Sequence, residues 1–184
     1  MMKQVRIFKA IAVIVLVVLV GFAIKSLLFS NYVVDGKSME PTLEDGNLMM
    51  VNKVVYELTD VHRFDIIVFH ANEQEDYVKR VIGLPGDEIE YRNDRLYING
   101  QYIEEDFLDS YKEKNHQGRY TEDFTLQELT GNKRVPAGNY FVMGDNRIDS
   151  LDSRSFGFIN TDAIVGKVDL AYWPNQKSQA TFGK

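Results

Sequence analysis

The sequence predicts a mainly β protein: an antiparallel β-sheet domain that follows a single N-terminal transmembrane helix. Three observations predict this class, namely an uncharged apolar segment near the N-terminus, short strand-like runs after it, and a length of 184 residues. A chain of this length has room for one membrane segment and one globular domain of ordinary size. We therefore expect a cytoplasmic N-terminus at 1–9, a transmembrane helix at 10–29 and an extracytoplasmic domain at 30–184.

The apolar segment is long enough to cross a bilayer. Residues 10–24 contain no charged side chain, and apolar residues resume after Lys25. About 20 residues, rising 1.5 Å each, span the hydrocarbon core, and 10–29 supplies them if the Lys25 side chain reaches the outer interface. A buried core helix would need a far larger domain around it. A cleavable signal peptide would need small residues at a cleavage site, and the residues that follow are Phe29, Ser30, Asn31 and Tyr32.

Charges near the N-terminus set the orientation of this helix. Lys3, Arg6 and Lys9 precede it, and together with Lys25 they give residues 1–25 a charge of +4. Basic residues stay in the cytoplasm, so the rest of the chain lies on the far side of the membrane. The whole chain carries −6, so its other part carries −10, which would repel the phosphates of a nucleic acid. The chain has no cysteine, which excludes disulfides and cysteine-ligated metals.

After the apolar segment, short runs rich in Val, Ile, Tyr and Phe alternate with Gly, Pro, Asn and Asp, as is typical of strands joined by tight turns. Asn99-Gly100 separates two such runs and predicts a hairpin, because a type I′ turn needs positive φ at both central residues. Residues 104–133 are polar and without periodicity, so we expect an inserted loop or small subdomain there. The expected strands are Leu48–Val55, Asp65–Phe69, Tyr77–Ile82, Glu88–Tyr91, Leu96–Ile98, Gln101–Ile103, Tyr140–Met143 and Ile164–Trp173.

A turn early in this domain presents a candidate nucleophile, Ser38. Gly36 precedes it by two residues and Pro41 follows it. Glycine allows a turn that is closed to other residues, and proline restricts the residue before it, so this segment can hold a hydroxyl in a fixed, exposed position. Most clusters of Gly, Ser and Pro only cap a turn, so a chemical role for Ser38 requires a base nearby.

The run Tyr77–Ile82 contains a candidate base, Lys79. Successive side chains of a strand face opposite sides of the sheet, so either Lys79 or Arg80 points towards the interior or a cleft. A lysine can accept a proton only if its surroundings make it neutral, as burial does. The alternative is a solvated lysine on an edge strand, which is the commoner place for lysine.

Three runs, 33–42 around Ser38, 77–87 around Lys79 and 144–154, together resemble the bacterial type I signal peptidases, in particular the Gram-positive branch. These are membrane-anchored endopeptidases with a Ser-Lys dyad that remove signal peptides from exported proteins. The resemblance implies that Ser38 is the nucleophile and Lys79 the general base, and that the reaction passes through an acyl-enzyme. It implies no metal and no cofactor. The implied partners are the signal peptides of translocated precursors and membrane lipid.

The resemblance also implies supporting roles. Ser150 matches the position at which the family places a serine hydroxyl against the lysine amine, where it would orient the base. Asp152 and Arg154 are two residues apart, hence on one side of an extended segment, and match a structural ion pair behind the site. A signal peptide would add as a β-strand at the strand edges near the dyad, with pockets for small side chains at its −1 and −3 positions. The residues expected to bind it are Val34, Met39, Tyr77 and Val78.

The chain departs from the family pattern at two positions. Some members supply an oxyanion-hole hydroxyl two residues before the nucleophile, where this chain has Gly36, so this segment offers only main-chain N–H groups. The family usually has glycine at the place of Phe64, a change that should alter local packing rather than chemistry.

Other classes of protein fit the sequence less well. A self-cleaving Ser-Lys peptidase of the repressor type needs an N-terminal DNA-binding module, and an apolar segment stands in its place. A membrane-tethered β domain that only binds exported proteins has no use for Ser38, Lys79 and Ser150 together. The three histidines lack the spacing of a metalloprotease, and no S-x-x-K pattern of the penicillin-binding proteins occurs.

Overall fold

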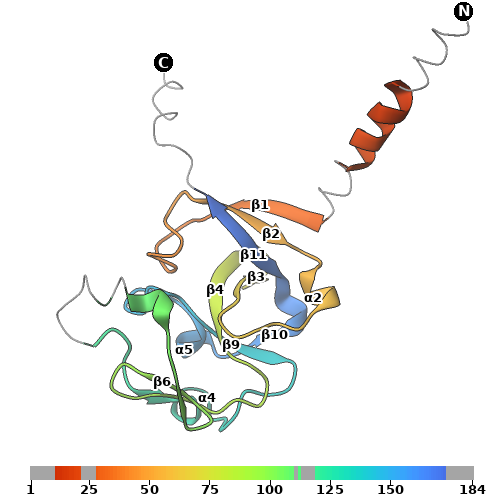
Figure 1. Ribbon diagram of the computed structural model, residues 1–184. Helices are drawn as coiled ribbons and strands as arrows, with labels where there is room; N and C mark the ends of the chain where they lie inside the picture. Colours follow the sequence, from red (N-terminus) through yellow and green to blue (C-terminus); the bar gives the residue numbers. More distant parts are fainter. Residues whose placement is uncertain (1–10, 22–27, 110–111, 113–118, 173–184) are drawn as a thin grey trace, which may run out of the picture.

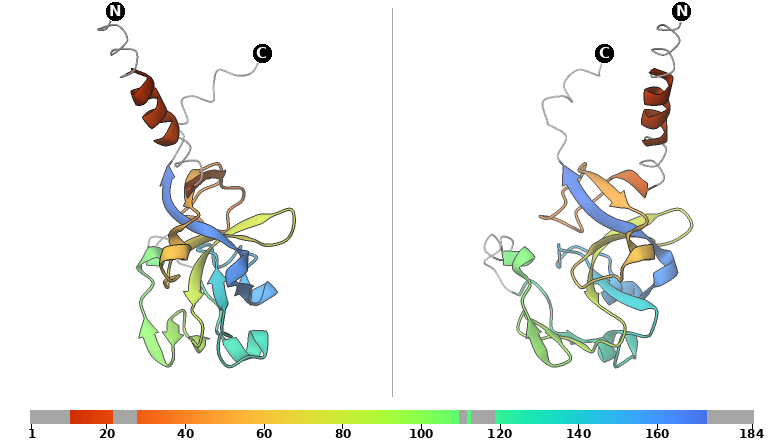
Figure 2. Two further views of the ribbon diagram at one scale, coloured as in Figure 1. Left: turned by 90° about the vertical axis from the view of Figure 1, so that its right-hand side faces the viewer. Right: turned by 45° about the vertical axis from the view of Figure 1, so that its right-hand side comes forward.

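The computed structural model describes residues 11–21, 28–109, 112 and 119–172, and in them it shows a β domain of two antiparallel sheets (Figure 1). This confirms the mainly β class expected from the sequence. The seven-stranded sheet has the order β1-β2-β11-β3-β4-β9-β10 and the four-stranded sheet the order β7-β6-β5-β8. The four-stranded sheet lies at the end of the domain away from β1 (Figure 2).

The strands of the large sheet are β1 (Phe29–Val33), β2 (Leu48–Asn52), β3 (Ile66–His70), β4 (Asp76–Gly83), β9 (Asn139–Met143), β10 (Ile159–Asn160) and β11 (Ile164–Tyr172). Those of the small sheet are β5 (Ile89–Tyr91), β6 (Leu96–Ile98), β7 (Gln101–Ile103) and β8 (Phe124–Thr125). The helices are short: α2 (Val55–Leu58), α4 (Leu126–Thr130), α5 (Ser153–Phe156) and the 3₁₀ turns η1 (Asp106–Leu108) and η2 (Thr161–Ala163).

The strands expected from the sequence are present, with ends that differ by a few residues. The hairpin between β6 and β7 turns at Asn99 and Gly100, whose φ angles of 51° and 80° are those that a type I′ turn requires. The last expected strand, Ile164–Trp173, corresponds to β11, and Trp173 lies outside the described residues. Three strands were not expected: β1, β8 and β10.

Apolar side chains fill both faces of the large sheet, because neighbouring residues of a strand point to opposite sides. On β3, Val68 belongs to one buried cluster, which also holds Met39 and Met49, whereas Phe69 belongs to a second cluster on the other face. A third cluster, which includes Tyr91, packs residues of the small sheet against the ends of β4 and β9.

Residues 11–21 form a helix, drawn in red in Figure 1, and the large apolar side chains between Ile11 and Val20 are 48 to 65% exposed. Within the described part of the chain, the structure contains no helix that is both long and apolar enough to cross a membrane. Of the expected span 10–29, residues 10 and 22–27 lie outside the described part, as does all of 1–9. Phe29 is already the first residue of β1 and pairs with Asn52.

The segment 104–133, where we expected an inserted loop or small subdomain, contains regular secondary structure. It contains η1, β8 and α4, and β8 completes the small sheet by pairing with β5. Thr125 and Glu128 form a capping box at the start of α4, and Gly131, at a φ of 74°, ends this helix. Residues 110–111 and 113–118 lie outside the described part of the segment.

Candidate active site

Ser38 and Lys79 meet at the surface of the large sheet. Lys79 Nζ donates a hydrogen bond of 2.7 Å to Ser38 Oγ and another of 3.0 Å to the carbonyl oxygen of Val78. Lys79 lies on β4 and is only 4% exposed, whereas Ser38 lies in the turn between β1 and β2 and is partly exposed. The structure thus brings together the serine and the lysine that the sequence singled out.

Backbone bonds hold the turn that carries Ser38. Val34 N–H donates to Asn47 O at 2.8 Å, and Gly46 N–H donates back to Val34 O at 2.9 Å, which closes the loop at its base. Gly36 has a φ of +92°, in the region that favours glycine, and its N–H donates to Asp45 Oδ1. The sequence therefore builds a closed loop that holds the Ser38 hydroxyl over β4.

The loop after β9 contacts the turn that carries Ser38 from the other side. Asn146 N–H donates to Ser38 O at 3.0 Å, and Asn146 Nδ2 donates to Lys37 O at 3.2 Å. Gly144 packs directly against this contact: a Cβ atom placed on it would lie 2.4 Å from Ser38 O and 2.2 Å from Ser150 Oγ. Since real Cβ atoms essentially never come this close, only glycine fits.

Burial changes the ionisation of Lys79. It lowers the pKa of the amine from its ordinary value of 10.5 to about 8, and the charge of Asp152 acts in the opposite direction. The ring of Tyr77 lies 5.3 Å from Lys79 Nζ. Among the residues that the structure describes, no carboxylate lies within ion-pair distance of Lys79.

Asp152 and Arg154 form the ion pair that the sequence led us to expect, although not on an extended segment. Asp152 is the N-cap of α5, and Arg154 binds both of its carboxylate oxygens at 2.8 Å. Burial alone would raise the pKa of Asp152, but the Arg154 hydrogen bonds and charge, with the N–H of Gly144, outweigh it and lower the pKa. The negative charge of Asp152 is therefore already paired with the guanidinium of Arg154.

Ser150 does not make the hydrogen bond expected of it. Its Oγ is buried and lies on the side of Asp152, whose pKa it helps to lower, while Lys79 Nζ donates instead to Ser38 and Val78. The side chain nevertheless packs on Gly144, next to the backbone of Ser38. Ser150 thus lies next to the Ser38 backbone, with its hydroxyl not bound to Lys79.

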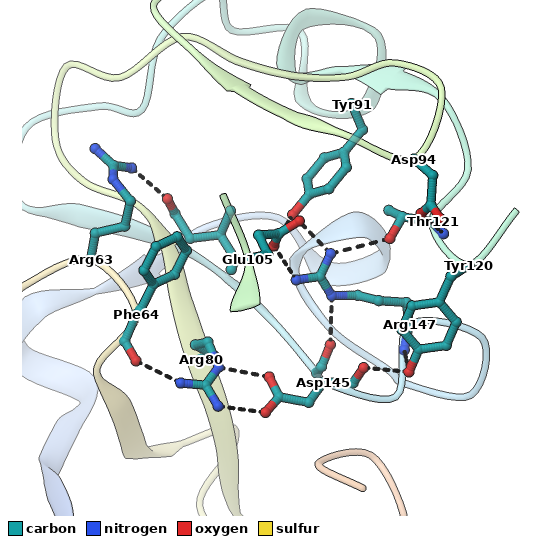
Figure 3. A network of polar contacts seen from close by, with 12 residues as sticks. Arg63, Phe64, Arg80, Tyr91, Asp94, Glu105, Tyr120, Thr121, Asp145 and Arg147 are labelled. Carbon is teal, nitrogen blue, oxygen red and sulfur yellow. Dashed lines mark hydrogen bonds and ion pairs between the residues drawn. The ribbon is translucent and has the colours of Figure 1, made fainter. Parts of the chain in front are cut away.

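Arg80, the next residue of β4, points away from Ser38, as strand alternation predicted. Its Nε and Nη2 bind the two oxygens of Asp145 at 2.8 and 2.5 Å, and its Nη1 donates to the carbonyl oxygen of Phe64 (Figure 3). Thr42, four residues after Ser38 in the chain, also donates to Asp145. The Arg80–Asp145 pair therefore connects β4, the loop after β9 and the turn that carries Ser38.

A second buried network joins the same loop to the inserted segment. Arg147 is fully buried, and it binds Glu105 at 2.5 Å, the hydroxyl of Tyr91 at 2.8 Å and that of Thr121 at 3.2 Å (Figure 3). Tyr120 donates to the carbonyl oxygen of Asp145, beside Arg147. Glu105, Tyr120 and Thr121 lie in the segment 104–133, and nothing in their sequence spacing identifies them as partners of this loop.

Comparisons with known proteins fit this geometry. The family model described as "Signal peptidase, peptidase S26" matches residues 5–173. Signal peptidase I of Bacillus caldolyticus is 62% identical over 82% of this chain and 83% of its own length. Signal peptidase IB of Staphylococcus aureus (strain COL) is 43% identical over 88% of this chain and 86% of its own.

The chain belongs to the signal peptidase family, peptidase S26. It is a serine peptidase, a signal peptidase I that removes signal peptides. The fold agrees: a crystal structure of a signal peptidase I from Enterococcus faecalis V583 superposes with a TM-score of 0.57 and 46% sequence identity, over 60% of this chain and 97% of that one.

Phe64, at which the resemblance implies a glycine, has a backbone conformation that suits glycine. Phe64 adopts a φ of 72°, a left-handed conformation that glycine adopts without strain. Its ring packs edge-on against Phe107 with centroids 5.2 Å apart, and its carbonyl oxygen accepts from Arg80. Phe64 therefore contacts the surroundings of Arg80, on the side of β4 away from Ser38.

A cavity of about 210 Å³ opens beside the Ser38–Lys79 pair of this signal peptidase. Three of the four residues expected to bind substrate line it: Val34, Tyr77 and Val78. The expectation for Met39 was wrong, because its side chain is fully buried in the core beneath the turn and does not line the cavity.

The N-terminal half of β4 lies beside this cavity, and one of its two edges is not paired with another strand among the described residues. β4 pairs with β3 from Asp76 to Arg80, but its pairing with β9 begins only at Arg80. On the β9 side, the stretch from Asp76 to Lys79 therefore has no strand partner among the described residues. An unpaired edge is a template for an added strand.

The described histidines take no part in the site. His62 lies near Asp65, and His70 pairs with Asp76 at 2.6 Å. Both are well exposed, and neither makes a hydrogen bond to Ser38. His116 lies outside the described residues.

Proposed function

We propose that Ser38 is the nucleophile and Lys79 the general base of this signal peptidase. The observation that carries the proposal is the 2.7 Å hydrogen bond between Lys79 Nζ and Ser38 Oγ, in a site where burial brings the pKa of the lysine to about 8. A base with a pKa near the working pH is neutral often enough to accept a proton and acidic enough to return it.

The reaction then proceeds in two halves. Neutral Lys79 takes the proton of Ser38 Oγ as the oxygen attacks the scissile carbonyl, and the resulting ammonium gives that proton to the leaving amine of the mature protein. This leaves the signal peptide as an ester on Ser38. Lys79 next accepts a proton from water as the water attacks the ester, and the proton returns to Ser38 Oγ when the bond breaks.

The Ser38 N–H is the donor best placed for the oxyanion of the tetrahedral intermediate. Among the described residues it donates no hydrogen bond, so it is available to a ligand. The Gly36 N–H, in contrast, is already bound to Asp45. Preorganised donors that point at the developing charge stabilise such intermediates strongly.

Ser150 and the Asp152–Arg154 pair support the base rather than react. Ser150 Oγ is buried, packs on Gly144 next to the backbone of Ser38, and helps to lower the pKa of Asp152. Arg154 neutralises Asp152, which limits how far this carboxylate raises the pKa of Lys79. Burial, and not this pair, is what lowers the pKa of Lys79.

The signal peptide adds as a strand along the free edge of β4, from Asp76 to Lys79. Its −1 and −3 side chains enter the 210 Å³ cavity next to Ser38, where Val34, Val68 and Val78 form apolar walls. A cavity of this size, shared between two side chains, favours small residues such as alanine.

A transmembrane helix within 10–29 anchors the enzyme in the cell membrane, with 1–9 in the cytoplasm and the catalytic domain, to residue 184, outside. The exposed apolar side chains of the helix at 11–21 favour this arrangement, since lipid would cover them. Alkaline carbonate should leave the full chain in the membrane pellet, and protease added outside intact spheroplasts should digest the domain. Extraction into the supernatant would contradict the anchor.

The decisive experiment uses the full chain in vesicles with a labelled secretory precursor. We expect wild type to release the mature protein, and Ser38→Ala to lose at least about 10⁴-fold in rate, as nucleophile removal does in serine peptidases. Ser155→Ala is a matched control, because Ser155 is an exposed serine on α5. Equal cleavage by wild type and Ser38→Ala would refute the proposed nucleophile.

A further inference from the structure

The peptide group that joins Lys37 to Ser38 is held by a residue outside the cavity beside the dyad. Asn146, in the loop after β9, donates from its side-chain Nδ2 to Lys37 O at 3.2 Å and from its backbone N–H to Ser38 O at 3.0 Å. Lys37 and Ser38 line the cavity of about 210 Å³, whereas Asn146 does not. Asn146 is only 5% exposed, so water has little access to its side chain.

A further hydrogen bond fixes which end of the Asn146 amide faces Lys37. Asn146 Oδ1 accepts from the N–H of Asp149 at 3.2 Å, so the NH₂ group is the end that is left for Lys37 O. Lys37 O also accepts from the N–H of Glu40 at 3.1 Å, a contact within the same turn. Among the described residues, the Asn146 side chain is thus the donor that connects this peptide group to another segment of the chain.

The direction of Lys37 O determines the direction of the Ser38 N–H. The two belong to one trans peptide group, in which the carbonyl oxygen and the N–H lie in one plane and point in opposite directions. Because Lys37 O faces Asn146, the Ser38 N–H faces away from it. This N–H donates no hydrogen bond among the described residues and is therefore available to a ligand.

We propose that Asn146 is a positioning residue for the oxyanion: its side-chain amide holds the Lys37–Ser38 peptide group so that the Ser38 N–H points at the developing charge. The inference rests on the function proposed above, in which this N–H is the oxyanion donor. Gly36 makes that N–H more important, since Gly36 has no hydroxyl and its own N–H is bound to Asp45. A donor that is already oriented stabilises the oxyanion without having to move during the reaction.

The test compares two inhibitors that differ in one group. The first is a substrate-like peptide whose C-terminal alanine carries an aldehyde. Ser38 Oγ adds to its carbonyl carbon, the C=O double bond becomes a C–O⁻ single bond, and Lys79 takes the serine proton. The second is the same peptide as a carboxamide, which binds without adding. With the full chain in detergent micelles, we expect wild type to bind the aldehyde at least about 100-fold more tightly.

Two variants remove the donor to Lys37 O in different ways. Asn146→Leu adds no charge, and Asn146→Asp keeps the shape but replaces the donor with an acceptor. In both, the inhibition constant of the aldehyde should rise at least about tenfold, while that of the carboxamide changes by less than about twofold. An inhibition constant does not depend on how much of the protein is folded, so a less stable variant remains informative.

Asn132 provides the matched controls. It is exposed, and its Nδ2 donates to the carbonyl oxygen of Thr130 at the end of α4. Asn132→Leu and Asn132→Asp make the same chemical changes as the two test variants, and both inhibition constants should equal those of wild type.

A ¹³C label at the aldehyde carbon separates the oxyanion from the nucleophile. The NMR shift of this carbon reports the ionisation of the hemiacetal oxygen. Loss of an oriented donor should raise the pH at which this oxygen ionises by about one unit or more in both Asn146 variants. A displaced Ser38 hydroxyl alone would weaken aldehyde binding without moving this titration.

The outcomes distinguish the positioning role from the proposed function. An unchanged ratio of the two inhibition constants, an unchanged titration in Asn146→Leu, or an effect confined to the charged Asn146→Asp would overturn the positioning role and leave the proposed nucleophile intact. A wild-type protein that binds the aldehyde no more tightly than the carboxamide, or that gives no hemiacetal signal, would overturn the proposed function and the positioning role with it.

Discussion

Lys79 and Arg80 are neighbours on β4, and both are buried cations, 4% and 7% exposed, yet their surroundings differ completely. Arg80 faces a carboxylate that matches its guanidinium, with two hydrogen bonds to Asp145. Lys79 faces a hydroxyl and a carbonyl oxygen, and the carboxylate of Asp152 that acts on it is already bound by Arg154.

This difference shows how one strand can carry both a structural and a chemical cation. A buried charge with a complete partner stays charged and holds segments together, whereas a buried amine without one loses its proton more easily. The partner, and not the depth of burial, separates the two roles. The five predictions below test this contrast.

The largest effect is expected for Lys79→Met. This change removes the base but fills a similar volume, so activity should fall at least about 10⁴-fold. The variant should also be more stable than wild type at pH 7, by up to about 3 kcal/mol, because it no longer buries an amine that prefers to be charged. Peptide cleavage and urea unfolding measure the two effects. Substantial activity in Lys79→Arg, whose guanidinium keeps its proton, would remove Lys79 as the base.

Ser150→Ala tests whether the neutral Ser150 hydroxyl helps to orient the Lys79 amine, which has no carboxylate bound to it among the described residues. We expect a loss of about 10² to 10⁴ in kcat, smaller than for Ser38→Ala or Lys79→Ala, because the base is loosened but present. The pH–rate profile should keep its single ionisation, while Ser150→Thr, which keeps the hydroxyl, should recover part of the rate. Wild-type rates in Ser150→Ala would mean that this hydroxyl only fills space.

Arg80→Met should unfold more easily rather than lose chemistry directly. It leaves Asp145 buried without its partner, at a cost of about 3 to 5 kcal/mol in the free energy of unfolding. Replacing both residues, in Arg80→Met/Asp145→Leu, should recover much of the loss, because no charge then remains unpaired. Denaturant curves of the single and double variants measure this. If the double variant is less stable than Arg80→Met, the pair is not a self-contained unit.

The pH dependence should follow Lys79 alone. Activity should rise with pH through one ionisation near 8, where the amine becomes neutral. Because the folded pKa lies below the unfolded value of 10.5, the unfolded chain binds the additional proton between these two pH values. The stability penalty is therefore complete below about pH 8 and disappears as the pH approaches 10.5, a gain of up to about 3 kcal/mol.

Lys79→Met provides the control for the stability part of this prediction. It lacks the amine, so the difference in unfolding free energy between variant and wild type should shrink as the pH rises from 8 to 10. A wild-type rate that stays flat from pH 6 to 9 would show that another group is the base.

The smallest effect concerns the backbone beneath Arg80. Phe64→Gly and Phe64→Ala both remove the ring that packs on Phe107, but only glycine adopts the φ of 72° without strain. We expect the glycine variant to be more stable than the alanine variant by about 1 kcal/mol, with both retaining activity. Equal stabilities would mean that the left-handed conformation carries no cost here.

Local sequence signals were enough for much of this molecule. The strands whose apolar residues recur in short runs, and the Asn99-Gly100 turn, depend on neighbours in the chain, and they appear where expected. The opposite directions of Lys79 and Arg80 follow from strand alternation alone. That Ser38 and Lys79 act as a pair was predicted from three sequence motifs considered together.

What the sequence did not reveal depends on distant partners. β1 was hidden because its apolar residues continue the apolar segment, and only pairing with β2 makes it a strand. Glu105 and Thr121 looked like surface residues, since nothing local indicates that Arg147 lies buried between them. Met39 is next to the nucleophile in sequence, but its direction depends on the core beneath the turn.

Gly144 lies where the turn that carries Ser38 and the loop after β9 are too close together for a larger side chain. The turn that carries Ser38 and the loop after β9 are in contact at the Cα atom of Gly144. A Cβ atom added there would lie 2.4 Å from Ser38 O. A methyl group needs about 3.5 Å to a neighbouring heavy atom, so alanine would act as a wedge of roughly 1 Å between the two segments. Displacements of that size can cost an enzyme about a hundredfold. Gly144→Ala would be a conservative substitution at most positions. Here it would displace Ser38 without changing any reacting group.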